Sequence, residues 1–325
     1  MNEEYPQGIP PEQIPLLQPL PRLTVVERLG LSPLVFALLA LFLVLVLYQT
    51  GGLVMTLILF GFNPLAAKAS DMRIAQGVGE VLFILIPALI LVRLITFHPA
   101  KYFRLKIPDI RLLGLALVGI FSLQQVLQIF MVFQDKIPIP AWIEKILEPL
   151  KQMMDILMKM LVGANSIPEL LIVVVVVALI PAIAEEFFFR GLVQKSFERS
   201  LGSTKGVLLT GVIFGGFHLN PSEFIPLAML GIYLGFLAMR SDCLWTSVVA
   251  HFFNNTVACI AFYMNIDEDA VATGSPSNMP IAELLFTIVV CSIIFAISTY
   301  YFLKLTQKNP PESIAFPGNQ TGSIG

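Results

Sequence analysis

Charged residues are scarce in this chain. Asp, Glu, Lys and Arg make up 13% of its 325 residues, against about 25% in soluble domains. Lys and Arg total 20 and Asp and Glu total 22, so the formal net charge is −2. The chain therefore lacks the excess positive charge that is typical of nucleic-acid binding, and we expect no nucleic-acid partner.

Cysteine is also scarce. The three cysteines, Cys243, Cys259 and Cys291, all lie in or beside apolar runs. This placement favours small buried side chains over a disulfide framework or a metal cluster. The first residues, MNEEYPQGIPPEQIP, are acidic and Pro-rich with no apolar core, so we expect no cleaved signal peptide.

Apolar residues, in contrast, are abundant. They make up 56% of the chain, and a membrane-spanning helix needs ~20 mostly apolar residues in a row. The candidate spans are residues 33–50, 76–96, 111–133, 168–190, 205–220, 224–239, 244–263 and 281–304. The sequence therefore predicts an all-α, polytopic integral membrane protein of about eight transmembrane helices. Residues 53–62 either extend the first helix or re-enter the membrane, and the fifth and sixth candidates are short.

The charges between the candidate spans predict an orientation. Lys and Arg gather in residues 93–111, in residues 195–205 and after the last span. These segments fall on one side of the bilayer if the eight helices alternate, whereas the acidic residues 267–269 fall on the other. Because basic loops stay in the cytoplasm, both termini are expected to be cytoplasmic.

Three segments lie outside the predicted spans. Residues 139–162 mix apolar residues with lysines and include Trp142, which favours an amphipathic helix in the membrane interface, kinked at Pro149. The alternative is a surface helix on an outer loop. Residues 1–31 form a Pro-rich tail and residues 306–325 a polar, disordered tail, so the transmembrane helical domain is 32–305.

Ionisable residues occur inside one apolar run, ALIPAIAEEFFFRGLVQ, residues 178–194. Such residues are costly in a bilayer and indicate a functional site with partners. Glu186 and Arg190 are spaced i,i+4, so they can pair on one face of the helix. Glu185 is rotated by about 100° from Glu186 and can point elsewhere.

Two later apolar segments carry histidines. His218 and His251 are two of the three histidines in the chain, and His251 is spaced i,i+4 from Asn255. A turn at residues 201–204 would make the helices on either side antiparallel and bring Glu185 and His218 to similar depth. Glycines that permit close helix contact there are Gly211, Gly215 and Gly216.

Each of these features has a structural explanation when taken alone. Glu186 with Arg190 could be a structural ion pair, His218 a hydrogen-bonded core residue, and the polar residues of 251–255 a contact between helices. Together they supply a base, a group that polarises water, and donors for an oxyanion. This combination is what hydrolysis of a peptide bond needs without a covalent nucleophile.

Three motifs carry a resemblance to a known family. EEFFFR at residues 185–190, FGGFH at 214–218 and HFFNN at 251–255 match EExxxR, FxxxH and HxxxN. In this order on separate helices, they resemble the CAAX prenyl protease and bacteriocin-processing family of intramembrane proteases, also called Rce-type or Abi. The resemblance covers residues 165–262, roughly the segment expected to form the protease core.

The resemblance implies an activity and a set of site residues. The activity is that of an intramembrane endopeptidase, which cleaves a membrane-associated protein or peptide near the cytoplasmic face of a prokaryotic plasma membrane. The implied roles are general base for Glu185, holding of the attacking water for His218, oxyanion stabilisation for His251 and Asn255, and orientation of the site for Glu186 and Arg190.

Metal dependence and two rival functions stay open. Glu185, His218 and His251 could form a zinc site of two histidines and one carboxylate, although the chain has no HExxH. We favour metal-free catalysis with no cofactor. The rivals are a non-enzymatic bacteriocin-immunity or membrane partner protein, and a proton-coupled transporter in which the same residues relay protons.

Overall fold

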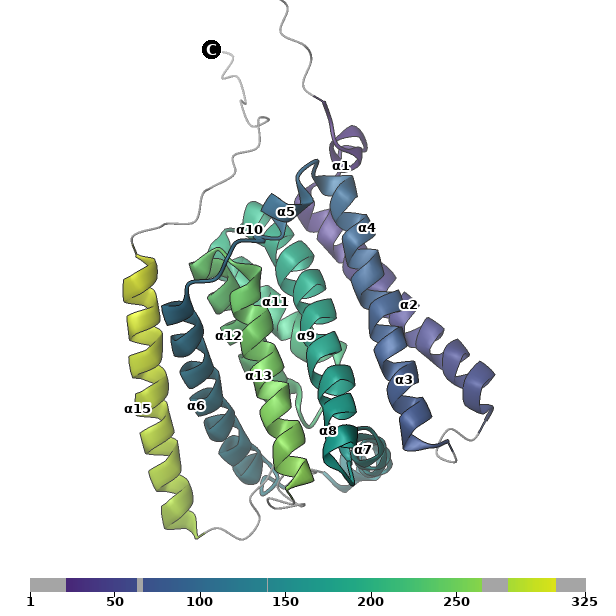
Figure 1. Cartoon of the computed structure of the whole chain (residues 1–325), viewed down its shortest axis with the longest axis vertical. Coiled ribbons are helices and arrows are strands. Elements are labelled where there is room, and N and C mark those ends of the chain that lie inside the picture. The colour runs from purple at the N-terminus through teal and green to yellow at the C-terminus, as the bar shows by residue number, and fades with distance from the viewer. Residues whose placement is uncertain (1–21, 63–66, 139, 265–279, 308–325) are drawn as a thin grey trace, which may run out of the picture.

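The described residues of the computed structural model, 22–62, 67–138, 140–264 and 280–307, form helices and no strands. Most of these helices lie side by side in one bundle, with their axes roughly aligned (Figure 1). This arrangement confirms the predicted all-α class. The predictions for residues 1–21 and 308–325, and for the acidic loop, fall outside the described residues.

The helices follow one another with short connections. In chain order they are α1 Val25–Arg28, α2 Pro33–Phe60, α3 Ala69–Glu80, η3 Val81–Leu85, α4 Ile86–Ile95, α5 Pro99–Tyr102, α6 Ile110–Gln134, α7 Ala141–Val162, α8 Ile167–Val173, η4 Val174–Leu179, α9 Ile180–Glu185, η5 Glu186–Gln194, α10 Lys195–Leu201, α11 Ser203–Phe217, α12 Phe224–Ser241, α13 Leu244–Tyr263 and α15 Ile281–Thr306. The three η elements are π-helical segments.

Within the described ranges, six helices are long and apolar enough to cross a membrane: Pro33–Phe60, Ala69–Ile95, Ile110–Gln134, Ile167–Leu201, Phe224–Ser241 and Ile281–Thr306. The chain is thus an integral, multi-pass membrane protein. α11 is shorter, and α13 carries His251 and two asparagines that lower its hydropathy. Each of the eight candidate spans coincides with a helix. Six of these helices, among the described residues, are long and apolar enough to cross a membrane, so the predicted number of about eight is approximate.

Two predicted boundaries need correction, and one alternative is decided. α2 continues to Phe60, so residues 53–60 extend the first helix, which was one of the two predicted alternatives. The fourth helix continues past residue 190 to Leu201, and the break at Gly202 has a φ of 86°, which suits glycine. α11 ends at Phe217, so His218 lies just beyond the helix and not within it.

α7 runs across the end of the bundle. Figure 1 views it nearly end-on, whereas the spanning helices run lengthwise. The only buried residue of its 22 is Val162, and the helix passes through Pro149 as one element. Its C-terminal end is anchored by the buried Arg73, which donates to the carbonyl of Leu161 at 2.9 Å and pairs with Glu169 at 2.7 Å. A crossing orientation with an exposed surface favours the interfacial interpretation.

α11 and α12 pack with their backbones almost in contact. A Cβ on Gly211 would lie 2.6 Å from the backbone nitrogen of Ile232, and one on Gly215 would lie 2.7 Å from the carbonyl oxygen of Phe224. Gly216 has open space, with its nearest neighbour, a ring atom of Phe224, at 3.8 Å. Gly211 and Gly215 therefore permit a close contact as the sequence predicted, but this contact is with α12; the close contact of α11 with the helix of Glu185 is at Gly206, where a Cβ would lie 2.8 Å from the backbone nitrogen of Glu198.

This packing predicts that Gly211→Ala lowers the stability of the helical domain. The new methyl group must push α12 away from α11, and overpacking of this kind costs about 1–3 kcal/mol. Thermal unfolding in detergent measures the effect. The matched control is Gly216→Ala on the same helix, where alanine fits and is favoured over glycine by about 0.5–1 kcal/mol. Equal melting temperatures for the two variants would contradict the described packing.

Candidate active site

The first site element is η5, the π-helical segment that begins at Glu186. Inside it, Arg190 Nη1 donates to Glu186 Oε1 at 2.7 Å, and both side chains are 0% exposed. Arg190 Nη2 also donates to the carbonyl of Gly231 on α12 at 3.1 Å, and the guanidinium lies 4.3 Å from the centre of the Phe214 ring. The predicted i,i+4 pair is therefore present, and π-helical segments are frequent at functional sites.

His251 of α13 reaches the same carboxylate. Its Nδ1 lies 3.0 Å from Glu186 Oε1. Because the oxygen of an ionised carboxylate accepts, Nδ1 carries the proton and donates. Glu186 thus holds both Arg190 and His251, which join η5 to α13 in one buried cluster. The sequence predicted the partner of Glu186 on its own helix but not this contact from another one.

Glu185 faces a different direction from Glu186. Its side chain is 12% exposed, against 0% for Glu186, and its Oε2 lies 4.0 Å from His251 Nε2. That Oε2 is buried and has no hydrogen-bond partner among the described residues. Glu185 is thus the more accessible acid of the two, and an oxygen of its carboxylate is free to bind another molecule.

His218 lies at the edge of the cluster. Its Nδ1 is 2.8 Å from the carbonyl oxygen of Phe214, so Nδ1 donates, and its side chain is exposed. The Phe214 ring contacts both histidines, with centroids 4.7 Å from His218 and 6.1 Å from His251. Phe189, on the helix of Glu185, packs on Phe214 at 5.1 Å, as expected for antiparallel neighbours.

Glu223 follows His218 in the loop before α12. Burial raises the pKa of Glu223, and the nearby His218 opposes this effect. The sequence analysis did not select this residue. It brings a further carboxyl group close to His218, on the side of the site that faces the N-terminal end of α12.

Asn255 lies one turn after His251 on α13 and is half-buried. Its Oδ1 accepts from Asn254 Nδ2 at 3.3 Å. This bond leaves the Nδ2 of Asn255 as the group that can donate to a substrate. His251 and Asn255 thus share one face of α13, as their spacing predicted.

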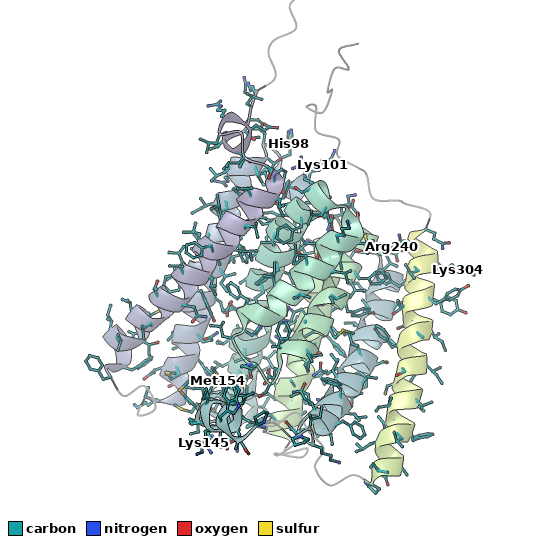
Figure 2. The ribbon with its side chains drawn as sticks, turned by 180° about the vertical axis from the view of Figure 1, so that it is seen from behind. His98, Lys101, Lys145, Met154, Arg240 and Lys304 are labelled. Atoms are coloured by element: carbon teal, nitrogen blue, oxygen red, sulfur yellow. The ribbon has the colours of Figure 1, made fainter. Side chains whose placement is uncertain are left out.

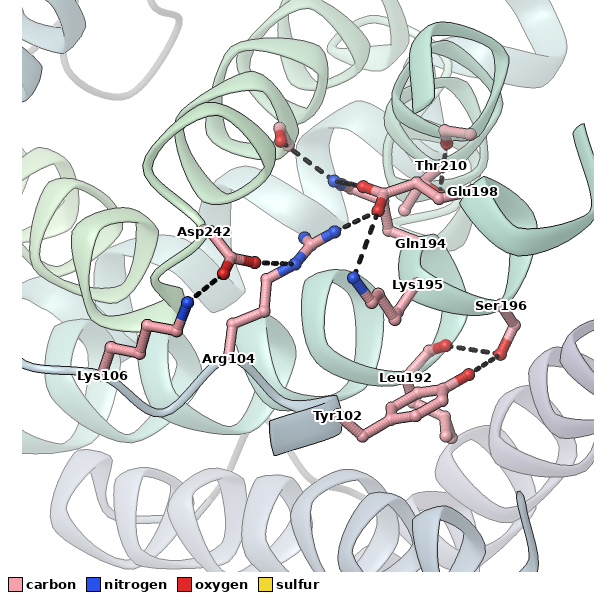
Figure 3. A network of polar contacts seen from close by, with 12 residues as sticks. Tyr102, Arg104, Lys106, Leu192, Gln194, Lys195, Ser196, Glu198, Thr210 and Asp242 are labelled. Carbon is pink, nitrogen blue, oxygen red and sulfur yellow. Dashed lines mark hydrogen bonds and ion pairs between the residues drawn. The ribbon is translucent and has the colours of Figure 1, made fainter. Parts of the chain in front are cut away.

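A second polar network fixes the helix that carries the two acids. Arg104, which has a φ of 57°, bonds Glu198 of α10 and lies 3.3 Å from Asp242 at the end of α12 (Figure 3). Gln194 donates to Glu198 at 2.8 Å and to the carbonyl of Gly235 at 3.0 Å. These bonds tie η5 and α10 to α12, which sets the position of the site from one end of the bundle.

Besides Glu223, the structure adds three residues that could not be selected from the motifs. Tyr48 of α2 donates to Glu80 Oε1 at 2.9 Å, and Gln76 donates to the same oxygen at 3.1 Å. Glu80 is 3% exposed and interacts electrostatically with Glu185. An acid alone in the apolar run of residues 76–92 is a signal that could have identified it.

The three candidate zinc ligands do not form a metal site in this structure. Over the described ranges, no group of three His, Cys, Asp or Glu side chains is placed to hold a metal ion. His251 Nδ1 donates to Glu186 and His218 Nδ1 to a backbone carbonyl. Both bonds leave Nε2 as the acceptor of its ring, as in metal-binding histidines, which commonly donate their other ring N–H to a carboxylate or a carbonyl.

The fold and these contacts define a class of protein, a helical membrane protein with a buried cluster of acids, an arginine and a histidine. Residues 167–257, which hold all three motifs, match the sequence model of the family described as type II CAAX prenyl endopeptidase Rce1-like. The match confirms the resemblance of the three motifs and supports, at the level of the family, an intramembrane peptidase. No curated protein and no solved structure matches the chain.

Proposed function

We propose that the protein is an intramembrane endopeptidase that hydrolyses a peptide bond of a membrane-associated protein or peptide with water activated by Glu185. One observation carries this proposal. Glu185 Oε2 and His251 Nε2 are 4.0 Å apart, and the carboxylate oxygen has no partner among the described residues. We infer that one water bridges these two groups during the reaction, with a hydrogen bond to each.

The proposed reaction begins with this water. Its oxygen attacks the carbonyl carbon of the substrate while its proton passes to Glu185. The carbon–nitrogen bond then breaks, and the leaving amine takes up the proton. Glu185 returns to its ionised form, so no covalent intermediate with the protein is needed. Glu186 and Arg190 orient the cluster, since they hold His251 and join η5 to α12.

The negative charge that develops on the substrate oxygen needs donors. Asn255 Nδ2 supplies one. Because the proton of His251 is on Nδ1, its Nε2 is an acceptor and can accept a hydrogen bond from the attacking water. His251 could donate to the oxyanion only if the ring carried a second proton, on Nε2. His218 Nε2 is likewise an acceptor, which agrees with the role in holding water that the resemblance implies for His218.

The mechanism uses no metal, which predicts that purified protein keeps its activity after treatment with a strong chelator. The reason for preferring metal-free catalysis is that the sequence has no HExxH motif. Cleavage and zinc content are measured before and after treatment. Stoichiometric zinc, with activity lost on its removal and restored on its return, would overturn the metal-free mechanism.

The proposed setting is a prokaryotic plasma membrane with both termini in the cytoplasm. α1 and the end of α15 lie at the same end of the bundle (Figure 1). His98, Lys101, Arg240 and Lys304 also lie at this end, whereas Lys145 of α7 lies at the other (Figure 2). A basic end is the one expected to face the cytoplasm.

The experiment that tests the function is comparative proteomics of membrane fractions from cells that carry the native chain or Glu185→Gln. Substrates should accumulate uncut in the variant, and their product peptides should disappear. An unchanged set of membrane peptides would contradict proteolysis. A bacteriocin-immunity phenotype that survives in the variant would favour the non-enzymatic alternative, and solute flux that survives loss of Asn255 would favour a transporter.

A further inference from the structure

A buried polar network joins α2 to α3 beside the proposed site. Tyr48 donates to Glu80 at 2.9 Å, and Gln76 donates to the hydroxyl of Tyr48 at 3.0 Å and to Glu80 at 3.1 Å. Both bonds to the acid go to its Oε1. Glu80 Oε2 is buried and has no hydrogen-bond partner among the described residues.

This network lies next to Glu185. α3, which ends at Glu80, packs against α9, which ends at Glu185, and the two acids interact electrostatically. The ring of Tyr48 is 6.3 Å from that of Phe217, the residue before His218. Two neighbouring acids, Glu80 and Glu185, thus each present a buried oxygen without a protein partner among the residues that the structure describes.

Resting on the proposed function, we infer that Glu80 is a positioning residue of the active site that acts through Glu185. Tyr48 and Gln76 hold one oxygen of Glu80 and thereby fix where its carboxyl group lies. The acid then sets the charge around Glu185 and exchanges a proton with it, directly or through one water. Pairs of acids at close range are a common means of handling one proton in two steps.

The proton balance follows the proposed reaction. The proton that leaves the attacking water goes to Glu185 and is shared with Glu80 while the substrate oxygen carries negative charge. When the carbon–nitrogen bond breaks, this proton passes to the leaving amine. The two acids end with the same number of protons as at the start, and no further reactant is required.

The shape and the acidity of Glu80 can be tested separately. Gln has the same shape and keeps an oxygen that accepts from Tyr48, but it cannot exchange a proton. Asp keeps the acid on a shorter side chain. The readout is the amount of the product peptides that depend on Glu185, divided by the amount of folded protein, with the melting temperature in detergent measured alongside.

We expect Glu80→Gln to reduce these products about 10- to 100-fold at a near-native melting temperature, and Glu80→Asp to retain more of them. A purely structural role predicts the reverse order, because Gln preserves the network and Asp shortens it. That reverse order, or equal product amounts in Glu80→Gln and native protein, would overturn the inference. The matched control is Glu283→Gln, an exposed acid at the start of α15, which should change nothing.

Two further arms keep the test decisive. If Glu80→Gln does not fold, Glu80→Asp is compared with Glu80→Asn, because these two side chains have equal size and differ only in acidity. Product peptides from Glu80→Asp but not from Glu80→Asn support the inference, and equal amounts from both overturn it. If Glu185→Gln loses no products, the proposed function itself fails. If it loses them while Glu80→Gln does not, only the role of Glu80 fails.

Discussion

In Glu185→Gln protein, cleavage is expected to fall to background while the helical domain stays folded. Gln has nearly the shape of Glu but cannot take a proton from water, so the first step of the proposed reaction is lost. The fold should tolerate the change, because the Oε2 of Glu185 makes no hydrogen bond within the described residues. The measurement is the cleavage rate of a substrate identified by the proteomics, with the melting temperature in detergent.

The same assay includes a variant with a graded loss. Asn255→Ala removes one donor to the developing negative charge, and loss of one such donor in other enzymes costs about 100- to 1000-fold in turnover, or ~2.7 to 4 kcal/mol. Substrate affinity should change less, since the donor acts mainly in the transition state. Substantial cleavage by Glu185→Gln would show that Glu185 is not the base and that the polar cluster is a structural network or a proton path.

Much of the fold could be predicted from the sequence because a bilayer demands long apolar helices. Hydropathy failed where polar residues are buried against protein. The fourth helix continues to Leu201 through Gln194, Lys195 and Ser196, whose side chains are buried. The first two contact Glu198, the partner of Arg104, and the hydroxyl of Ser196 bonds that of Tyr102. A hydropathy scan treats such residues as the end of a span, whereas the structure shows that they pack inside the bundle.

The candidate site could be predicted in part, for a related reason. Glu185, Glu186 and Arg190 stand out because ionisable residues are rare in an apolar run, and the spacing of the last two predicts their pair. The bond from His251 to Glu186 joins residues 65 positions apart and depends on tertiary packing, which spacing does not report. Glu80 is also an ionisable residue in an apolar run, but it lies outside the three motifs.

The second large effect is expected for Arg190→Met, which should strongly destabilise the protein. Arg190 and Glu186 are both 0% exposed and 2.7 Å apart. Removal of the cation leaves a carboxylate buried without its charge partner, which costs about 3–5 kcal/mol. Loss of the bond to Gly231 also frees η5 from α12. Thermal unfolding in detergent measures the loss as a lower melting temperature.

The double variant Glu186→Gln with Arg190→Met separates charge from shape. Replacing both members of a buried pair with neutral groups is often neutral for stability, so the double variant should recover most of the lost melting temperature. The amide oxygen that Glu186→Gln introduces would still accept from His251, so any activity that returns reports on that contact. The control is Arg111→Met, whose pair with Asp109 is exposed to solvent and should matter little. Two results would contradict a stabilising buried ion pair. One is a melting temperature of Arg190→Met equal to that of the native protein, and the other is a double variant with a lower melting temperature than Arg190→Met.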